Sequence, residues 1–145
     1  MNWLSKPQDG LLISGAPGRG KTHLAAAITR TLVLIQQEAL FLRCADFYRQ
    51  LREAYRTNSS EETVMAGPMK YRFVFLDDLG SGNLSDHERR STLELIDNRL
   101  NEELPTCITT NWNLDQISER LDERLASRLE SFLKLELEGD DRRVS

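Results

Sequence analysis

The sequence predicts an α/β fold in which a parallel five-stranded sheet lies between two layers of helices. Short apolar runs alternate with longer amphipathic stretches along the chain, a pattern typical of βαβ units. The length of 145 residues allows one domain, whose core can bury roughly two thirds of the surface of the unfolded chain. We therefore expect residues 1–145 to form a single three-layer domain.

The first βα unit is predicted near the N-terminus. Residues 11–14 form a short apolar run, Leu-Leu-Ile-Ser, which we interpret as the first strand. From Lys21 onward, apolar residues recur at the spacing of one helix face. These residues are Leu24, Ile28, Leu32 and Ile35.

A second strand and helix follow. Residues 39–44 form another short apolar run, and Phe47, Leu51 and Tyr55 then mark one face of a helix, with Asp46 as a candidate N-terminal cap. Residues 57–69 are polar and are interrupted by a Gly-Pro pair, so we predict a connection with one helical turn there.

The third strand gives the strongest strand signal in the chain. Residues 72–77 read Arg-Phe-Val-Phe-Leu-Asp, and Ser85 then opens a helix with Glu88 placed to complete a capping box. We expect this helix to end before Pro105. Its predicted inward residues are Leu93, Ile96 and Leu100.

The last third of the chain completes the sheet. Residues 107–110 form a fourth apolar run, and residues 114–131 contain patterns of two short helices. Residues 132–137 alternate between apolar and polar side chains, which predicts a fifth strand that is less buried than the others.

Composition and charge limit the kinds of partner. The chain has 19 Lys and Arg against 23 Asp and Glu, a net charge of −4, which argues against coating nucleic acid by bulk charge. A local contact with single-stranded DNA is left open; for Arg89 and Arg90 we favour ordinary surface salt bridges. No apolar run approaches the ~20 residues that span a bilayer, and no signal peptide is evident. We expect a cytoplasmic protein without membrane contact.

Residues 15–22 read GAPGRGKT and fit the phosphate-binding loop G-x-x-x-x-G-K-[ST] at every fixed position. The loop lies between a predicted strand and a predicted helix, where backbone N–H groups and the helix N-terminus can hold phosphate. A Gly-rich turn before a helix is the structural alternative. The predicted nucleotide-binding residues are Gly15, Ala16, Pro17, Gly18, Arg19, Gly20, Lys21 and Thr22, with His23 beside them.

Two acidic residues end the third predicted strand. Phosphate loops need an acidic partner for Mg²⁺, and Asp77 fits that role together with the hydroxyl of Thr22. Asp78 is placed to orient the attacking water or to accept its proton. Two adjacent acids can also simply begin a turn, but the complete phosphate loop favours the functional interpretation.

Three further polar side chains are candidates. Asn111 directly follows the fourth predicted strand and is expected to face the cleft, although an Asn in a turn is common. Arg124 and Arg128 lie four residues apart on one helix face, either as surface salt bridges or as a guanidinium supplied to a neighbouring active site. The two histidines and two cysteines suggest no metal site beyond Mg²⁺.

Four segments together resemble the core of AAA+ ATPases. They are residues 15–25 (GAPGRGKTHLA), 73–80 (FVFLDDLG), 107–113 (CITTNWN) and 123–129 (ERLASRL). The resemblance runs from about residue 11 to residue 144. It is strongest to the branch that contains bacterial replicative helicase loaders of the DnaC and DnaI type, the IstB-like transposition ATPases and the DnaA initiators.

The resemblance implies roles for individual residues and a P-loop NTPase fold. Lys21 and Thr22 match the Walker A pair, and Asp77 and Asp78 match the Walker B pair, so ATP or ADP and Mg²⁺ are the expected ligands. Asn111 matches the sensor-1 position. Arg128 matches an arginine finger that reaches the ATP of an adjacent subunit, with Arg124 as a second candidate, and Arg142 or Arg143 matches sensor 2.

The sequence departs from the family pattern in three ways. Loaders carry an N-terminal segment that grips the helicase, whereas only ten residues precede the first predicted strand, so we expect that partner-binding domain to be missing here. We also expect the C-terminal helical lid of many AAA+ proteins to be absent here, as in the loader branch. The second Walker B acid, Asp78, is Asp where many members have Glu.

We therefore expect a Mg-dependent ATPase that assembles into a ring or spiral through Arg128 and loads a hexameric replicative helicase in DNA replication. An IstB-like transposition helper is the first alternative. A small-molecule or nucleoside kinase built on the same loop is another, with residues 57–69 as the segment available for an insertion. A nucleotide-binding adaptor that does not depend on hydrolysis is the last.

Overall fold

Five parallel strands form one sheet in the order β2-β3-β4-β1-β5. The structure is a computed structural model that describes residues 10–139. The strands are β1 (Leu11–Ser14), β2 (Ala39–Arg43), β3 (Phe73–Asp77), β4 (Thr106–Thr110) and β5 (Leu133–Glu136). The helices are α1 (Lys21–Leu34), α2 (Cys44–Arg56), α3 (Glu61–Ala66), α4 (Asp86–Asn101), α5 (Leu114–Arg120) and α6 (Glu123–Leu129), with a 3₁₀ turn at Pro68–Lys70.

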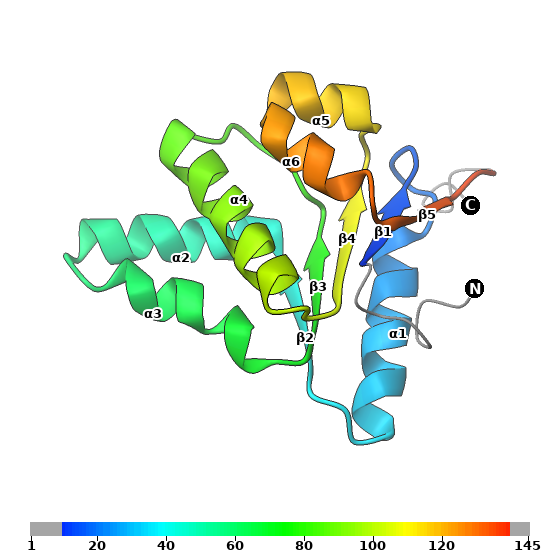
Figure 1. Cartoon of the computed structure of the whole chain (residues 1–145), viewed down its shortest axis with the longest axis horizontal. Coiled ribbons are helices and arrows are strands. Elements are labelled where there is room, and N and C mark those ends of the chain that lie inside the picture. The colour runs from blue at the N-terminus through cyan, green and yellow to red at the C-terminus, as the bar shows by residue number, and fades with distance from the viewer. Residues whose placement is uncertain (1–9, 140–145) are drawn as a thin grey trace.

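Each face of the sheet has its own apolar core. Residues of one parity, such as Ile13 and Phe75, pack against α1, while residues of the other parity, such as Leu12 and Leu76, pack against the remaining helices. Figure 1 shows α1 on one side of the strands and α2, α4 and α6 on the other. The predicted three-layer αβα architecture is confirmed, because successive strand residues point to opposite faces and both faces are covered.

The order of the strands determines where polar side chains meet. β1 and β3 both pair with β4, and in a parallel sheet their carboxyl ends lie at the same edge. The loops that follow β1, β3 and β4 therefore converge at that edge (Figure 1). This is the crevice in which open α/β sheets bind their ligands.

Several predicted elements are confirmed with small shifts. The capping box is present: the Ser85 side chain accepts from the N–H of Glu88, and the Glu88 carboxylate accepts from the N–H of Ser85. Strand β5 is mostly exposed, as its alternating pattern predicts. Within residues 10–139, no helix is both long and apolar enough to cross a bilayer.

Some local predictions are wrong. Helix α2 begins at Cys44, directly after β2, and has no side-chain cap, so Asp46 lies in the first turn instead of capping it. Tyr55 is 82% exposed, and Ile35 lies beyond the last turn of α1 and is 60% exposed. The polar connection contains a second helix, α3, in addition to the 3₁₀ turn.

A buried arginine joins α4 to the sheet. The side chain of Arg99 is inaccessible to solvent, and burial lowers its pKa to about 10. Its guanidinium donates five hydrogen bonds of 2.8–3.0 Å. The acceptors are the Thr106 hydroxyl and the carbonyl oxygens of Pro68, Tyr71, Arg72 and Pro105. Arg99 thus holds the loops at the amino ends of β3 and β4, opposite the edge described above.

Candidate active site

The predicted phosphate loop connects β1 to α1. Gly20 is the N-cap of α1 and has a φ of 88°, a conformation that side chains rarely adopt. Gly15 has a φ of 149°, and a Cβ there would lie 2.6 Å from the carbonyl oxygen of Leu137. Both positions therefore require glycine. Gly20 requires it because of its positive φ, and Gly15 because the chain just after β5 packs against the loop.

The Lys21 ammonium is held inside the loop. Lys21 is only 7% exposed, and its Nζ donates to the carbonyl oxygen of Ala16 at 2.8 Å. This contact spans the loop from its second residue to the first residue of α1. The positive charge is thereby placed beside the N-terminus of a 14-residue helix, where an anion is favoured.

A hydrogen-bonded group connects α1, β3 and β4. The Thr22 hydroxyl lies 3.0 and 3.1 Å from the two carboxylate oxygens of Asp77, to which it donates. Thr109 on β4 donates to Asp77 Oδ1 at 2.7 Å, and Asp77 is 3% exposed. Asp77 is therefore oriented by a hydroxyl from each neighbouring element.

Asp78 turns out of the strand toward the cavity. Its φ of 60° is unusual for a residue other than glycine, and its backbone N–H donates to the Thr109 hydroxyl at 2.8 Å. Burial raises the pKa of the Asp78 carboxyl, and the neighbouring Asp77 raises it further, while Lys21 opposes both effects. A carboxylate with a raised pKa is a better proton acceptor than an ordinary aspartate.

One cavity of about 540 Å³ collects most of the predicted residues. Ligand cavities of small molecules span about 300–1,000 Å³. Its lining consists of Pro17, Gly18, Gly20, Lys21, Thr22, His23, Asp78, Thr109 and Asn111. Gly15, Ala16 and Arg19 belong to the loop but do not line the cavity, and Asp77 lies buried beneath it.

The oxygen atoms at this site suit Mg²⁺. The Thr22 hydroxyl and the Asp77 carboxylate are hard oxygen ligands on neighbouring elements, as described above. Among residues 10–139, no group of three or more His, Cys, Asp or Glu side chains could hold a metal by itself. The donor set therefore fits an ion that takes its remaining ligands from phosphate and water, as Mg²⁺ does.

The predicted arginines lie elsewhere. Arg128 does not line the cavity of the phosphate loop; its Nε lies 2.9 Å from Asp97 Oδ1. Arg124 contacts Asp122, two residues before it. Arg89 contacts Asp86 within one helix turn, which confirms the surface salt bridge predicted for it. Arg142 and Arg143 lie outside the described residues.

Thr109 is a site residue that the sequence analysis did not identify. Its hydroxyl contacts both Walker B-like acids, and the next residue, Thr110, donates to the carbonyl oxygen of Leu79 at 3.1 Å. The available signal is a pair of threonines at the end of a buried strand, directly before Asn111. Threonine in such a strand is usually interpreted as a β-former, so its hydroxyl is easily overlooked.

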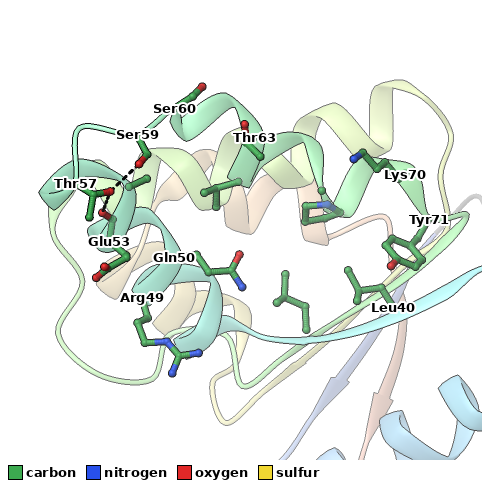
Figure 2. Close-up of a pocket in the computed structure, with 15 residues that line it drawn as sticks. Leu40, Arg49, Gln50, Glu53, Thr57, Ser59, Ser60, Thr63, Lys70 and Tyr71 are labelled. Carbon is green, nitrogen blue, oxygen red and sulfur yellow. Dashed lines mark hydrogen bonds between the residues drawn. The ribbon is translucent and has the colours of Figure 1, made fainter.

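A second hollow, larger than the phosphate-loop cavity, is separate from this site. It has about 830 Å³ and lies between β2, α2, α3 and the 3₁₀ turn. Figure 2 shows Lys70 and Tyr71 at one end of this hollow, and Thr57 and Ser59, which share a 2.7 Å hydrogen bond, at the other. None of its described lining residues lines the phosphate-loop cavity, and Glu53 is the one carboxylate among them. The hollow therefore adds no group to the site.

Comparisons with known proteins agree with the fold and the motif. The model of a family described as IstB-like ATP binding protein matches residues 1–133. The chain is 31% identical over 140 residues to the replicative helicase loader DnaC of Escherichia coli strain K12, covering 89% of this chain and 57% of that protein. The chain thus spans a little over half the length of this relative.

Solved structures show the same architecture. A crystal structure of the DnaC helicase loader matches with a TM-score of 0.77 at 28% identity, covering 91% of this chain and 81% of that one. A structure of DnaI matches with a TM-score of 0.77 at 26% identity, covering 92% and 72%. Domain III of DnaA from Thermotoga maritima shares the fold, with a TM-score of 0.80 at 20% identity over 97% and 60% of the chains. The predicted P-loop NTPase fold of an AAA+ core is confirmed.

Proposed function

The chain belongs to the family of IstB-like ATP-binding proteins, and from this premise we propose that it hydrolyses Mg-ATP as a self-assembling module that loads a replicative helicase onto DNA. The observation that carries this proposal is the convergence of four chemically distinct side chains on one cavity. They are Lys21, Thr22, Asp78 and Asn111, with Asp77 directly beneath.

Nucleotide binding is assigned to the phosphate loop and α1. The β-phosphate would lie in the curve of the loop, where backbone N–H groups and the helix N-terminus favour an anion. Lys21 would then exchange its contact with the Ala16 carbonyl for β- and γ-phosphate oxygens. Thr22 and Asp77 would hold Mg²⁺, which when bound neutralises charge on the phosphates.

Hydrolysis is assigned to Asp78 and Asn111. Both line the cavity from the ends of adjacent strands, so a water between them and the γ-phosphate would have an acceptor on one side and an amide on the other. The raised pKa of the Asp78 carboxyl suits a group that accepts a proton from water. The side chain of Asp78 is one methylene shorter than that of Glu, so we expect ATP turnover to be slow.

Assembly is assigned to Arg128. Since this arginine does not line the cavity of its own chain and is 54% exposed, it is available to a neighbouring copy. A residue supplied in this way requires a head-to-tail interface, which generates a ring or an open spiral. A guanidinium added to a transferring phosphoryl group is worth about 10³ to 10⁵ in rate in P-loop NTPases.

The helicase partner rests on the relatives. DnaC is named a replicative helicase loader and is 31% identical to this chain. The matching family model supports a second candidate, an IstB-like transposition helper. Co-purification of the tagged chain with a hexameric replicative helicase supports the loader, and co-purification with a transposase in its place supports the helper.

The kinase and adaptor alternatives have less support. A kinase needs an acceptor site beside the phosphates, but the hollow of about 830 Å³ shares no described residue with the phosphate-loop cavity. ATP hydrolysis without an added acceptor would count against it. An adaptor would keep its partner-loading activity when Asp78→Asn blocks hydrolysis, whereas the proposed loader would lose it.

The experiment that tests the proposal follows ATP hydrolysis as a function of protein concentration, with and without single-stranded DNA. We expect turnover per site to rise with concentration or with DNA in the unmodified chain. Arg128→Ala should abolish that rise while leaving ATP affinity nearly unchanged. If Arg128→Ala instead destroys nucleotide affinity and turnover does not depend on concentration, the proposed role of Arg128 is wrong.

A further inference from the structure

Arg128 is held from one side by Asp97. Asp97 is on α4 and Arg128 on α6, and the distance between Asp97 Oδ1 and Arg128 Nε is 2.9 Å. The carboxylate oxygen has no solvent contact, and no aligned hydrogen bond reaches it from any of the described residues. Asp97 therefore attracts the guanidinium of Arg128 mainly as a nearby opposite charge, and this attraction acts at the Nε end of the guanidinium.

Among the described residues, Asp97 is the one acidic neighbour of Arg128. A cavity of about 530 Å³ lies at the junction of α4 and α6, and within residues 10–139 no carboxylate other than Asp97 lines it. The other arginine in the lining, Arg124, is engaged by Asp122. No other ion pair or hydrogen bond of the Arg128 side chain is seen within residues 10–139.

The contact through Nε has a geometric consequence. A guanidinium is a planar fork of five N–H donors, and an anion contacts it best along one edge with two parallel hydrogen bonds. A carboxylate at Nε leaves the edge formed by the two terminal nitrogens available. Arg128 is 54% exposed, whereas Asp97 is 30% exposed, so the arginine is the more accessible partner of this pair.

We propose that Asp97 is a positioning residue for Arg128: it holds the guanidinium by Nε so that the terminal nitrogens face the nucleotide phosphates of a second copy of this chain. The inference rests on the proposed function of Arg128. Asp97 contacts neither nucleotide nor water in this account and acts only through Arg128. Without it, a long exposed side chain samples many rotamers, and misplacement by about 1 Å can cost 10²-fold in rate.

The test is a double-mutant cycle on the full chain. Asp97→Asn, Arg128→Ala and the double variant are compared for turnover per site at saturating protein and ATP, for ATP affinity, and for thermal stability. Asp122→Asn is the matched control, because Asp122 contacts Arg124 on the same helix and Asn also caps helices well.

We expect Asp97→Asn to lower turnover about tenfold with unchanged ATP affinity, and Asp122→Asn to leave turnover unchanged. In the Arg128→Ala background, Asp97→Asn should cause no further loss, since its only route of action is gone. The isosteric amide of Asp97→Asn preserves the shape of the site, so we expect its thermal stability to stay near that of the unmodified chain. A loss of turnover at unchanged thermal stability is then not caused by unfolding.

Two results would overturn the inference. The first is full turnover of Asp97→Asn together with reduced turnover of Arg128→Ala. This result would show that Asp97 does not position Arg128, while the proposed function of Arg128 itself would stand. The second is an equal loss from Asp97→Asn with and without Arg128, which would mean that Asp97 acts independently. If Arg128→Ala alone has no effect, the proposed function itself fails, and this outcome is recognised without the Asp97 variants.

Discussion

Replacing Thr109 with valine should remove the two hydrogen bonds by which β4 supports Asp77 and Asp78. The Thr109 hydroxyl donates to Asp77 Oδ1 at 2.7 Å and accepts the backbone N–H of Asp78 at 2.8 Å. The side chain is 1% exposed, so water cannot replace either contact. Valine has nearly the same shape and removes only the hydroxyl.

The size of the effect follows from these two contacts. A hydrogen bond to a charged group contributes about 1.5 to 3 kcal/mol, and a buried N–H left without a partner costs about 1 to 3 kcal/mol. Asp77 keeps its contact with Thr22, and valine favours strands, so the two terms do not simply add. We expect Thr109→Val to lower the free energy of unfolding by about 2 to 4 kcal/mol.

The assay combines urea unfolding, followed by circular dichroism, with ATP titrations in Mg²⁺ and in chelator. Thr110→Val is the matched control, because this buried hydroxyl contacts only the backbone at Leu79 and Trp112. Both variants should lose stability, but only Thr109→Val should lose part of the Mg²⁺-dependent ATP affinity. Unchanged stability of Thr109→Val, or an equal change in Mg²⁺ response in both variants, would mean that the Thr109 hydroxyl does not position Asp77 and Asp78.

Three other variants test contacts that stabilise the fold. Arg99→Lys cannot reproduce five hydrogen bonds and should lower the free energy of unfolding by about 3 kcal/mol or more in urea titrations, whereas wild-type stability would mean that water replaces the fork. Gly80→Ala would place a Cβ 2.2 Å from the ring of Trp112 at a φ of 91°, so the tryptophan emission should shift and Tm should fall; an unchanged spectrum would contradict the close contact. Burial raises the pKa of the Asp122 carboxyl, but hydrogen bonds from the Arg124 side chain and from the backbone at the start of α6 outweigh it and hold the pKa below its usual value. Asp122→Ala should therefore cost about 0.5 to 2 kcal/mol at neutral pH, and the difference from wild type should shrink as the pH falls through the lowered pKa of Asp122; a difference that is unchanged in acid would mean that the charge is irrelevant.

Much of the nucleotide site could be predicted because its signals are local. The phosphate loop is contiguous, and its glycines and Lys21 are fixed by the shape of one turn. Asp77 and Asp78 follow the most apolar strand in the chain. The rule that parallel strands end at the same edge predicts that Asn111 faces the cleft, and Asn111 does line the cavity.

Other features depend on contacts between distant segments. Arg99 is charged and lies in an amphipathic helix, so its pattern alone suggests a solvated residue, yet five acceptors from two loops bury it. The contact between Asp97 and Arg128 requires the packing of α6 on α4, which no spacing encodes. Helix α2 starts directly after β2 without a cap, so the usual boundary signal is missing.

The most direct test of the central claim is calorimetric titration of ATP into the unmodified chain and into Lys21→Ala, each with Mg²⁺ and with chelator. Arg30→Ala, an exposed change on α1, is the control. We expect binding that weakens in chelator, a loss of at least about tenfold in affinity for Lys21→Ala with an unchanged circular dichroism spectrum, and no loss for Arg30→Ala. Equal ATP affinity of the unmodified chain and Lys21→Ala would contradict this expectation.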